Sequence, residues 1–294
     1  MHKLKIQYLR REDINENAWN HVVRHSPFNR VYAYSWFLDA MSDCAWTGIV
    51  FGDYEAVFPV LIKKKLFIPY VTTPPLCQQL GIYMIDQHNT ALYLDDILKS
   101  LKSYLKTEVT VHTGSGFPNH CTIRTNHILS LNAPYEILQK GYNRNTIRNL
   151  HTAKKADTTI MQLFEVKSFL DFTQEHEPSG SIKHIYTQLH QLISHTLLHR
   201  NGYILAVYHE GRPEAMAYYI EDQERIYFLV CASTEKGKTL KMMYLLIDHL
   251  IKTYADTSKI FDFTGSNMPS IARRNLGFGA TVESYYFLKM KIFD

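Results

Sequence analysis

The stretch YILAVYHEGRPEAMAYYIEDQERIYFLVC, residues 203–231, decides the fold. It contains three apolar segments of strand length, at residues 203–208, 215–220 and 226–231. The segment between the first two, Glu210-Gly211-Arg212-Pro213, has the glycine and proline that turns favour, and the segment at 221–225 is charged. This pattern predicts three antiparallel strands joined by tight turns.

The residues that follow predict a helix, a strand, a short helix and a closing strand. Apolar residues recur every three or four positions between residues 240 and 254, as they do on a helix with one buried face. Residues 260–263 predict a strand, and after a Gly-Ser turn and a short helix, Gly279 can end that helix in a left-handed conformation. Residues 282–289 alternate in character and predict the last strand.

The segments upstream give the chain two halves of similar order. Residues 158–166 predict a strand and residues 181–199 an amphipathic helix, so the second half begins near Tyr135. In the first half, helices are predicted around 18–23, 34–41 and 91–105, and strands at 46–51, 56–62 and 109–112. We therefore predict an α/β protein with α+β mixed sheets and two domains, at residues 1–134 and 135–294.

The composition indicates a globular protein. Of the 294 residues, 46% are hydrophobic, and no segment has the composition of a flexible linker. The first residues lack an apolar signal segment, and no segment approaches the ~18 apolar residues of a membrane helix, so we expect a cytoplasmic protein. The net charge of +4 does not by itself indicate nucleic acid, and the spacing of the four cysteines indicates neither disulfides nor metal.

This order of elements resembles the GNAT acyltransferase fold, and the chain is similar to two such units in tandem, as in the FemAB and FemX peptidoglycan aminoacyltransferases. Three segments carry the resemblance: YNRNTIRNL at 142–150 followed by AKKA at 153–156, FDFTGS at 261–266, and IAR at 271–273 with GFGA at 277–280. The first half matches loosely, through Pro74, Gln78, Gln79 and Gly81.

The resemblance implies an N-acyltransferase or aminoacyltransferase. Such an enzyme moves an acyl group from a thioester (acyl-CoA) or an aminoacyl-tRNA to an amine, here on a bacterial cell-envelope precursor or a similar small molecule, without a metal. A non-catalytic GNAT-like binding protein is the alternative, because residues 234–239 (TEKGKT) keep only one glycine of the family's donor loop and lack its leading Arg or Gln.

The start of the helix after residue 231 is the predicted donor site. A helix start presents backbone N–H groups and the positive end of the helix dipole to an anion. We therefore expect Lys236, Gly237, Lys238 and Thr239 to bind the donor's phosphate, with an ordinary loop as the alternative. Residues 232–239 also satisfy a relaxed Walker A pattern, but a P-loop follows the first strand of a parallel sheet and this segment follows an antiparallel one.

The candidates for catalysis lie near the end of the chain. Acyl transfer to an amine removes one proton and returns another, so Asp262 and Tyr285 are the candidate general base and acid. The alternative for Asp262 is that it caps the turn at Gly265-Ser266. The resemblance implies a cation beside the tetrahedral intermediate, which would be Arg273 or its neighbour Arg274, and Ser266 would face the reacting carbonyl.

Three other clusters have simpler interpretations beside the functional ones. Arg144 and Arg148 lie four residues apart on one helix face and either bind a phosphate or tRNA backbone or form a solvated basic face. His195 and His199 have the spacing of a zinc helix, but Thr196 stands where a metalloprotease has its glutamate, so we predict no metal. The lysines at 63–65 are expected to end a strand or hairpin.

Overall fold

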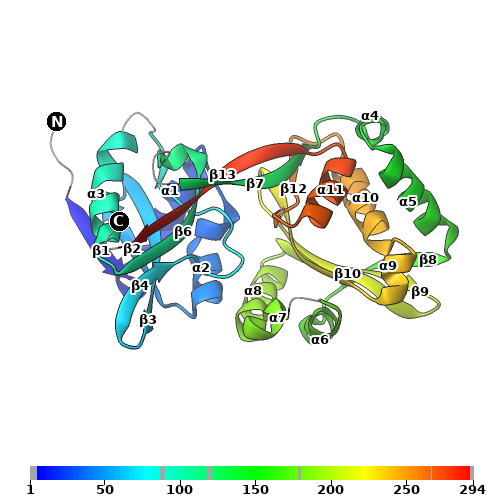
Figure 1. Cartoon of the computed structure of the whole chain (residues 1–294), viewed down its shortest axis with the longest axis horizontal. Coiled ribbons are helices and arrows are strands. Elements are labelled where there is room, and N and C mark those ends of the chain that lie inside the picture. Colours follow the sequence, from blue (N-terminus) through cyan, green and yellow to red (C-terminus); the bar gives the residue numbers. More distant parts are fainter. Residues whose placement is uncertain (1–4, 87–89, 118–120, 178–179, 266, 292–294) are drawn as a thin grey trace. The chain divides into compact units, whose positions relative to one another are not determined.

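The structure is a computed structural model that describes residues 5–86, 90–117, 121–177, 180–265 and 267–291 (Figure 1). The chain forms two compact units. Unit 1 comprises Met1–Arg124 and Ser284–Asp294, and unit 2 comprises Thr125–Glu283. The expected division lies after residue 134 instead. In the structure, residues 284–294 join unit 1, and residues 125–134 join unit 2.

Unit 1 contains a mixed sheet in the order β1-β2-β3-β4-β6-β13, with β5 beside β3. Among the described strands of this unit β4 and β6 run parallel, and the other paired strands are antiparallel. Its elements are β1 (Ile6–Arg10), η1 (Arg11–Asp13), α1 (Glu16–His25), η2 (Val31–Ala33), α2 (Ser35–Ser42), β2 (Trp46–Phe51), β3 (Ala56–Lys65), β4 (Ile68–Thr72), β5 (Tyr83–Met84), α3 (Thr90–Lys102), β6 (Lys106–His112), η4 (Thr113–Ser115) and most of β13 (Thr281–Lys291).

Unit 2 repeats this order as β8-β9-β10-β11-β12-β7, and in its described part β11 and β12 run parallel while the other paired strands are antiparallel. Its elements are β7 (Cys121–Ser130, from Thr125 on), α4 (Tyr135–Lys140), α5 (Arg144–Lys155), β8 (Thr158–Leu163), α6 (Val166–His176), α7 (Ser181–His184), α8 (Tyr186–Leu198), β9 (Gly202–His209), β10 (Arg212–Glu221), β11 (Arg225–Ser233), α9 (Glu235–Thr239), α10 (Met242–Tyr254), β12 (Ile260–Asp262) and α11 (Pro269–Gly277). The three antiparallel strands expected from residues 203–231 are β9, β10 and β11.

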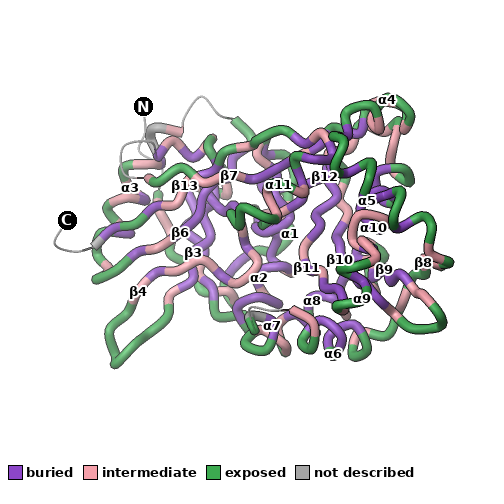
Figure 2. Tube along the Cα trace, turned by 45° about the vertical axis from the view of Figure 1, so that its right-hand side comes forward, coloured by how far each residue is buried: buried purple, intermediate pink, exposed green. Residues whose placement is uncertain are grey.

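Helices cover both faces of the unit 2 sheet (Figure 1). Helix α10 contacts β9, β10 and β11 on one face and also contacts α5, whereas α6 and α8 pack on the other face. The buried stripe of α10 includes Leu246, Ile247, Leu250 and Ile251, as the periodicity predicts. Burying such a side chain stabilises a fold by roughly 1.5–3 kcal/mol, so α10 is a main support of the sheet. Figure 2 shows the buried strands beneath it.

The helix expected from residue 240 is interrupted at its start. Residues of α9 form a separate short helix, and Lys241 then adopts a left-handed conformation with φ 62° before α10 begins at Met242. Apolar periodicity continues across this break, so the sequence pattern does not reveal it.

The predicted closing strand is β13, and its residues from Ser284 on belong to unit 1. From Tyr285 on, β13 pairs with β6, and Leu288 and Met290 lie in the core of unit 1. Unit 2 obtains the corresponding strand from β7, which pairs with β12. Alternation along a strand shows that one face is buried but not which strand it pairs with, so the sequence could not reveal this exchange.

We expect Leu288→Ala to destabilise the protein by about 2–5 kcal/mol, because it leaves a cavity in the core of unit 1. Urea denaturation measures this loss. Val282→Ala is the matched control, since Val282 lies on the same strand but is 55% exposed. Equal stability of the two variants would show that β13 does not complete this core.

Candidate functional site

The strands β11 and β12 run side by side for only three residue pairs, ending at Tyr227 and Asp262. Beyond this pair β11 continues to Ser233, while the chain after β12 turns away through Thr264 and Gly265, whose φ angles are 41° and 66°. The hydroxyl of Thr264 donates to the carbonyl of Phe228 at 2.5 Å and holds this turn against β11. The end of β11 therefore extends past its parallel neighbour.

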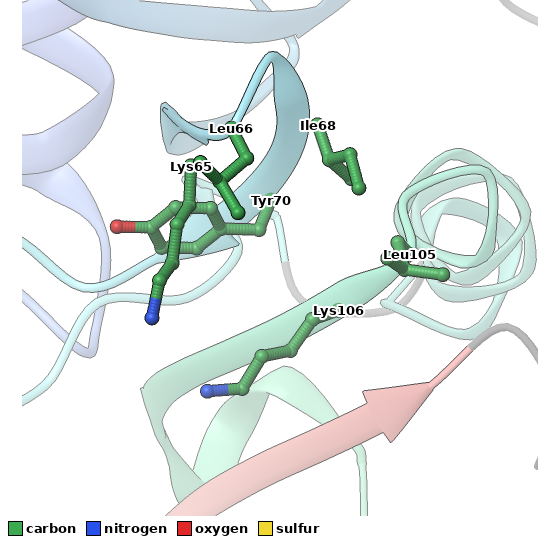
Figure 3. A pocket seen from close by; sticks show the side chains of 6 residues that line it. All are labelled: Lys65, Leu66, Ile68, Tyr70, Leu105 and Lys106. Carbon is green, nitrogen blue, oxygen red and sulfur yellow. The ribbon is translucent and has the colours of Figure 1, made fainter.

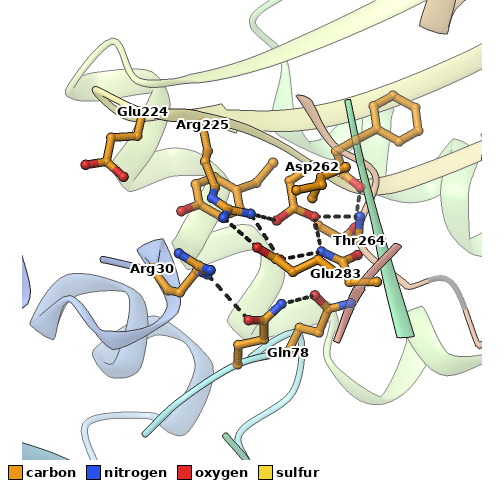
Figure 4. A network of polar contacts seen from close by, with 12 residues as sticks. Arg30, Gln78, Glu224, Arg225, Asp262, Thr264 and Glu283 are labelled. Atoms are coloured by element: carbon orange, nitrogen blue, oxygen red, sulfur yellow. Dashed lines mark hydrogen bonds and ion pairs between the residues drawn. The ribbon is translucent and has the colours of Figure 1, made fainter. Parts of the chain in front are cut away.

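A buried charge cluster holds the two strands together at the point where they part (Figure 4). The Asp262 carboxylate, which is 0% exposed, accepts from Asn126 Nδ2 at 2.8 Å, Arg225 Nη1 at 3.0 Å and the Thr264 N–H at 3.0 Å. Arg225 also donates through Nη2 to Glu283 at 2.7 Å. Burial raises the pKa of Asp262, and the Arg225 guanidinium opposes that shift.

This geometry favours the capping interpretation of Asp262. A general base must contact the proton that it removes, and here both carboxylate oxygens are buried and accept hydrogen bonds from groups that hold the turn. The second candidate, Tyr285, is 2% exposed in unit 1 and lies opposite His112 on β6. The third, Ser266, is outside the described residues. The predicted catalytic roles of Tyr285 and Ser266 remain predictions.

A pocket of about 370 Å³ lies at the end of β11 in unit 2. The strand contributes Cys231, Ala232 and Ser233 to its lining. The remaining walls come from α9, the start of α10, α11 with the residue before it, and the end of α6: Gly237, Lys238, Lys241, Met243, Tyr244, Met268, Ser270, Ile271, Arg274 and His176. The pocket is therefore built around the part of β11 that β12 does not accompany.

The lining of this pocket is strongly basic. Lys238, Lys241 and Arg274 contribute three cations, and none of the described lining residues is acidic. The carboxylate of Glu235, outside the lining, pairs with Lys238 at 2.6 Å. The first turn of α10 also faces the pocket, so the positive end of its dipole adds to the field of the side chains. The arrangement suits an anionic ligand such as a phosphate.

Two of the four residues expected to bind the donor phosphate line the pocket, and two do not. Gly237 and Lys238 line the pocket, whereas Lys236 pairs with Glu210 at 2.6 Å and the Thr239 hydroxyl donates to the Glu235 carbonyl at 3.0 Å. Neither Lys236 nor Thr239 lines the pocket.

The backbone N–H groups of Gly237 and Lys238 have partners within this segment. The Gly237 N–H donates to Thr234 Oγ1 and the Lys238 N–H to the Thr234 carbonyl, both at 2.9 Å, because Thr234 caps α9. The segment is thus a capped helical turn, and it does not form the phosphate-binding loop of a Walker A motif.

Gly237 is required for close packing of α9 on β10. A Cβ atom at this position would lie 2.0 Å from the carbonyl oxygen of Glu214. Glu214 is the extra residue of a bulge where β10 pairs with β9, and its carboxylate also accepts from the Thr234 hydroxyl. The one glycine retained in this segment therefore serves packing, which in turn places Lys238 at the pocket.

The segments that carry the sequence resemblance meet at the end of α11. The Asn143 N–H donates to the Gly277 carbonyl at 2.9 Å, and the Phe278 ring packs edge-on against Tyr142 at 5.1 Å between centroids. These contacts position α11 so that Arg274 lines the pocket. Its neighbour Arg273, the cation expected from the sequence, is exposed and does not line it. The structure thus favours the alternative residue.

Cys231 also lines the pocket, although no motif in the sequence marks it as part of a site. Burial raises the pKa of its thiol, and nearby Arg274 opposes this shift only in part. The thiol is therefore protonated at neutral pH, and it is suited to lining the pocket rather than to nucleophilic attack. Its position at the end of an apolar strand gave no signal that a site lies there.

The other predicted groups lie away from this pocket. Arg144 and Arg148 are exposed on α5, and Arg148 donates to Asn145 at 2.7 Å. In unit 1, the Gln79 side chain accepts from Arg30 at 3.4 Å and donates to Gln78 at 3.2 Å (Figure 4). The described residues include no group of three or more His, Cys, Asp or Glu side chains that could hold a metal ion, and the ring of His195 on α8 contacts that of His199, the residue after this helix.

Comparison with known proteins supports a GNAT/FemAB-related acyltransferase fold. The family described as acetyltransferase (GNAT) domain matches residues 139–269. The crystal structure of FemX superposes with a TM-score of 0.66 at 12% identity, covering 96% of this chain and 97% of that one. A tandem GNAT protein from the clavulanic acid biosynthesis pathway gives 0.55 at 11% identity, covering 98% and 99%.

The structure of L-PGS from Bacillus licheniformis is also similar, with a TM-score of 0.56 at 9% identity over 95% of this chain and 92% of that one. At these identities the similarity establishes the fold, which is the tandem GNAT-like architecture. No curated protein matches the sequence. Within the described residues, no helix is both long enough and apolar enough to cross a membrane.

We expect Asp262→Asn to destabilise the protein by about 3–5 kcal/mol, because it removes the charge that compensates buried Arg225 and replaces one of two accepting oxygens by an NH2 group that faces a donor. Glu283→Gln should cost less, since the Glu283 side chain is 18% exposed. Urea denaturation compares them. An Asp262→Asn variant with unchanged stability and reduced transfer activity would instead support the general-base role.

Proposed function

We propose that this protein is an N-acyltransferase or aminoacyltransferase whose donor binds through its phosphate groups in the basic pocket at the end of β11. The observation that carries the proposal is the convergence of Lys238, Lys241 and Arg274 on a pocket whose described lining contains no acid. Charge-assisted hydrogen bonds from such cations to phosphate are among the stronger polar interactions in proteins.

The fold supports this use of the pocket. The sheet of unit 2 opens where β11 and β12 part, and the start of α10 faces the same space. The apolar lining residues Met243, Tyr244 and Ile271 provide a surface for the uncharged part of a donor, while the cations bind its charged part. An acyl donor with a phosphate-bearing carrier matches both features.

In the proposed reaction the acceptor amine forms a bond to the carbonyl carbon of the donor, and the bond from that carbon to sulfur or to the tRNA oxygen breaks. The amine loses a proton, and the leaving group gains one. We assign the stabilisation of the tetrahedral intermediate to Arg274 rather than Arg273, because Arg274 lines the pocket.

Both acyl-CoA and aminoacyl-tRNA satisfy the charge requirement, and a second surface bears on the choice. Arg144, Arg148, His151 and Lys155 are all exposed on α5 at spacings of three and four residues. This stripe suits contacts with a nucleic-acid backbone, which a tRNA donor would need and acyl-CoA would not. We propose a cytoplasmic reaction with an amine of a cell-envelope precursor as the acceptor.

A binding protein that has lost catalysis is the second candidate. It is favoured by the burial of Asp262, since the described part of unit 2 then contains no carboxylate in the pocket to act as a base. Binding and transfer must therefore be measured separately.

Isothermal titration with acetyl-CoA, coenzyme A and aminoacyl-tRNA tests the proposal. We expect one donor class to bind, and Lys238→Ala, Lys241→Ala and Arg274→Ala each to weaken binding by about 1.5–3 kcal/mol, the range for a hydrogen bond to a charged group. Lys236→Ala is the matched control, because Lys236 lies on the same short helix but outside the pocket.

Release of free thiol or deacylated tRNA in the presence of an amine then distinguishes an enzyme from a binding protein. If the wild type binds none of these donors, or if Lys236→Ala weakens binding as much as Lys238→Ala, the proposed donor site is wrong.

A further inference from the structure

The hairpin of β3 and β4 in unit 1 ends in an exposed apolar tip. Lys65 pairs with Ile68 across the hairpin, so Leu66 and Phe67 alone form the turn. These two side chains are 82% and 95% exposed, and Ile68 beside them is 47% exposed. Figure 2 shows the exposed end of this hairpin. Side chains this apolar are rarely left in water at a turn without a reason.

The backbone of the turn makes the choice of residues more unusual. Leu66 and Phe67 both have positive φ angles, 50° and 67°. A two-residue turn with two positive φ angles is the type I′ turn, which favours Asn-Gly because residues with larger side chains are strained there. The tip therefore combines an unfavourable conformation with unfavourable exposure. Such a combination points to a function that requires these side chains at this place.

The neighbouring residues are basic. Lys63, Lys64 and Lys65 are exposed on the strand that leads to the tip. The ion pairs of the described residues include none with these three ammonium groups, whereas nearby Lys106 pairs with Glu108 at 2.7 Å. Three uncompensated cations therefore stand directly behind two large apolar side chains.

A shallow pocket of about 370 Å³ adjoins the tip (Figure 3). It is lined by Lys65, Leu66, Ile68, Tyr70, Leu105 and Lys106, and the view shows the side chains of Lys65 and Lys106 ending on one side of the pocket, away from Ile68 and Leu105. Leu105 is 40% exposed, so it extends the apolar surface beyond the hairpin itself. This surface could receive an acyl chain or the apolar edge of a lipid headgroup, with the ammonium groups close to a phosphate.

We propose that this tip docks the protein on an anionic lipid bilayer. Leu66 and Phe67 enter the boundary between headgroups and acyl chains, and Lys63, Lys64 and Lys65 contact the lipid phosphates. The tip is narrow, with two apolar side chains at its end, whereas a stable protein interface buries about 1,200–2,000 Å² in total. The proposal does not depend on the proposed transferase activity.

Flotation with lipid vesicles tests the docking directly. The full-length protein is mixed with vesicles of phosphatidylcholine alone or of phosphatidylcholine with phosphatidylglycerol, and the bound fraction is measured at low and high salt. We expect binding to the anionic vesicles that weakens with salt and is much weaker on the neutral ones. Replacing all three lysines by Gln should weaken it on the order of a hundredfold, from about fivefold per lysine.

The tip is tested by Leu66→Asn with Phe67→Gly, which gives the turn the residues that its conformation favours. This variant should be at least as thermally stable as the wild type and should bind anionic vesicles at least about tenfold more weakly. Phe67→Asn alone is a second variant with the same expected direction. Leu198→Asn is the matched control, because Leu198 is 79% exposed in unit 2 and should not affect binding.

Three results would overturn the proposal. The wild type could fail to bind anionic vesicles, or the tip variants could bind as well as the wild type. Alternatively, light scattering could show a wild-type dimer that Leu66→Asn with Phe67→Gly converts to a monomer without any vesicle binding, in which case a second copy of the chain covers the tip.

Discussion

The candidate site depends on the short parallel pairing of β11 and β12. The two strands pair over three residue pairs. Where the pairing ends, the Asp262 carboxylate accepts hydrogen bonds from Arg225 and Asn126, and Arg225 also donates to Glu283. Such a cluster is costly to desolvate and is stable only when its partners satisfy one another. Its position determines where β11 loses its neighbour, and hence where a pocket can form in the sheet.

The contacts beyond this point place cations rather than a catalytic carboxylate at the pocket. Thr234 caps α9, and Gly237 lets that helix pack on the bulge at Glu214, so that Lys238 reaches the lining. The packing of Phe278 fixes α11 with Arg274 toward the same space. The loop after β12 therefore does serve the site, through the helix that it leads to, while Asp262 supports the turn.

Much of the fold could be predicted because its signals are local. Alternation and turn residues located β9, β10 and β11, and apolar periodicity located α10. The partners of Asp262 could not be predicted in this way, since Asn126 is 136 residues distant in sequence and neither side chain reveals the other. The exchange of β7 and β13, the left-handed Lys241 and the choice of Arg274 over Arg273 likewise depend on tertiary packing.

Protection of Cys231 from a maleimide by a bound donor tests directly whether the pocket at the end of β11 is the donor site. Cys231 lines the pocket, and exposed Cys44 in unit 1 is an internal reference that does not line it. Because burial raises the pKa of Cys231, labelling should be carried out at mildly alkaline pH and measured on each peptide by mass spectrometry. We expect acyl-CoA or aminoacyl-tRNA to slow the labelling of Cys231 and to leave that of Cys44 unchanged. If Cys231 is labelled at the same rate with every donor, the pocket at the end of β11 is not the donor site.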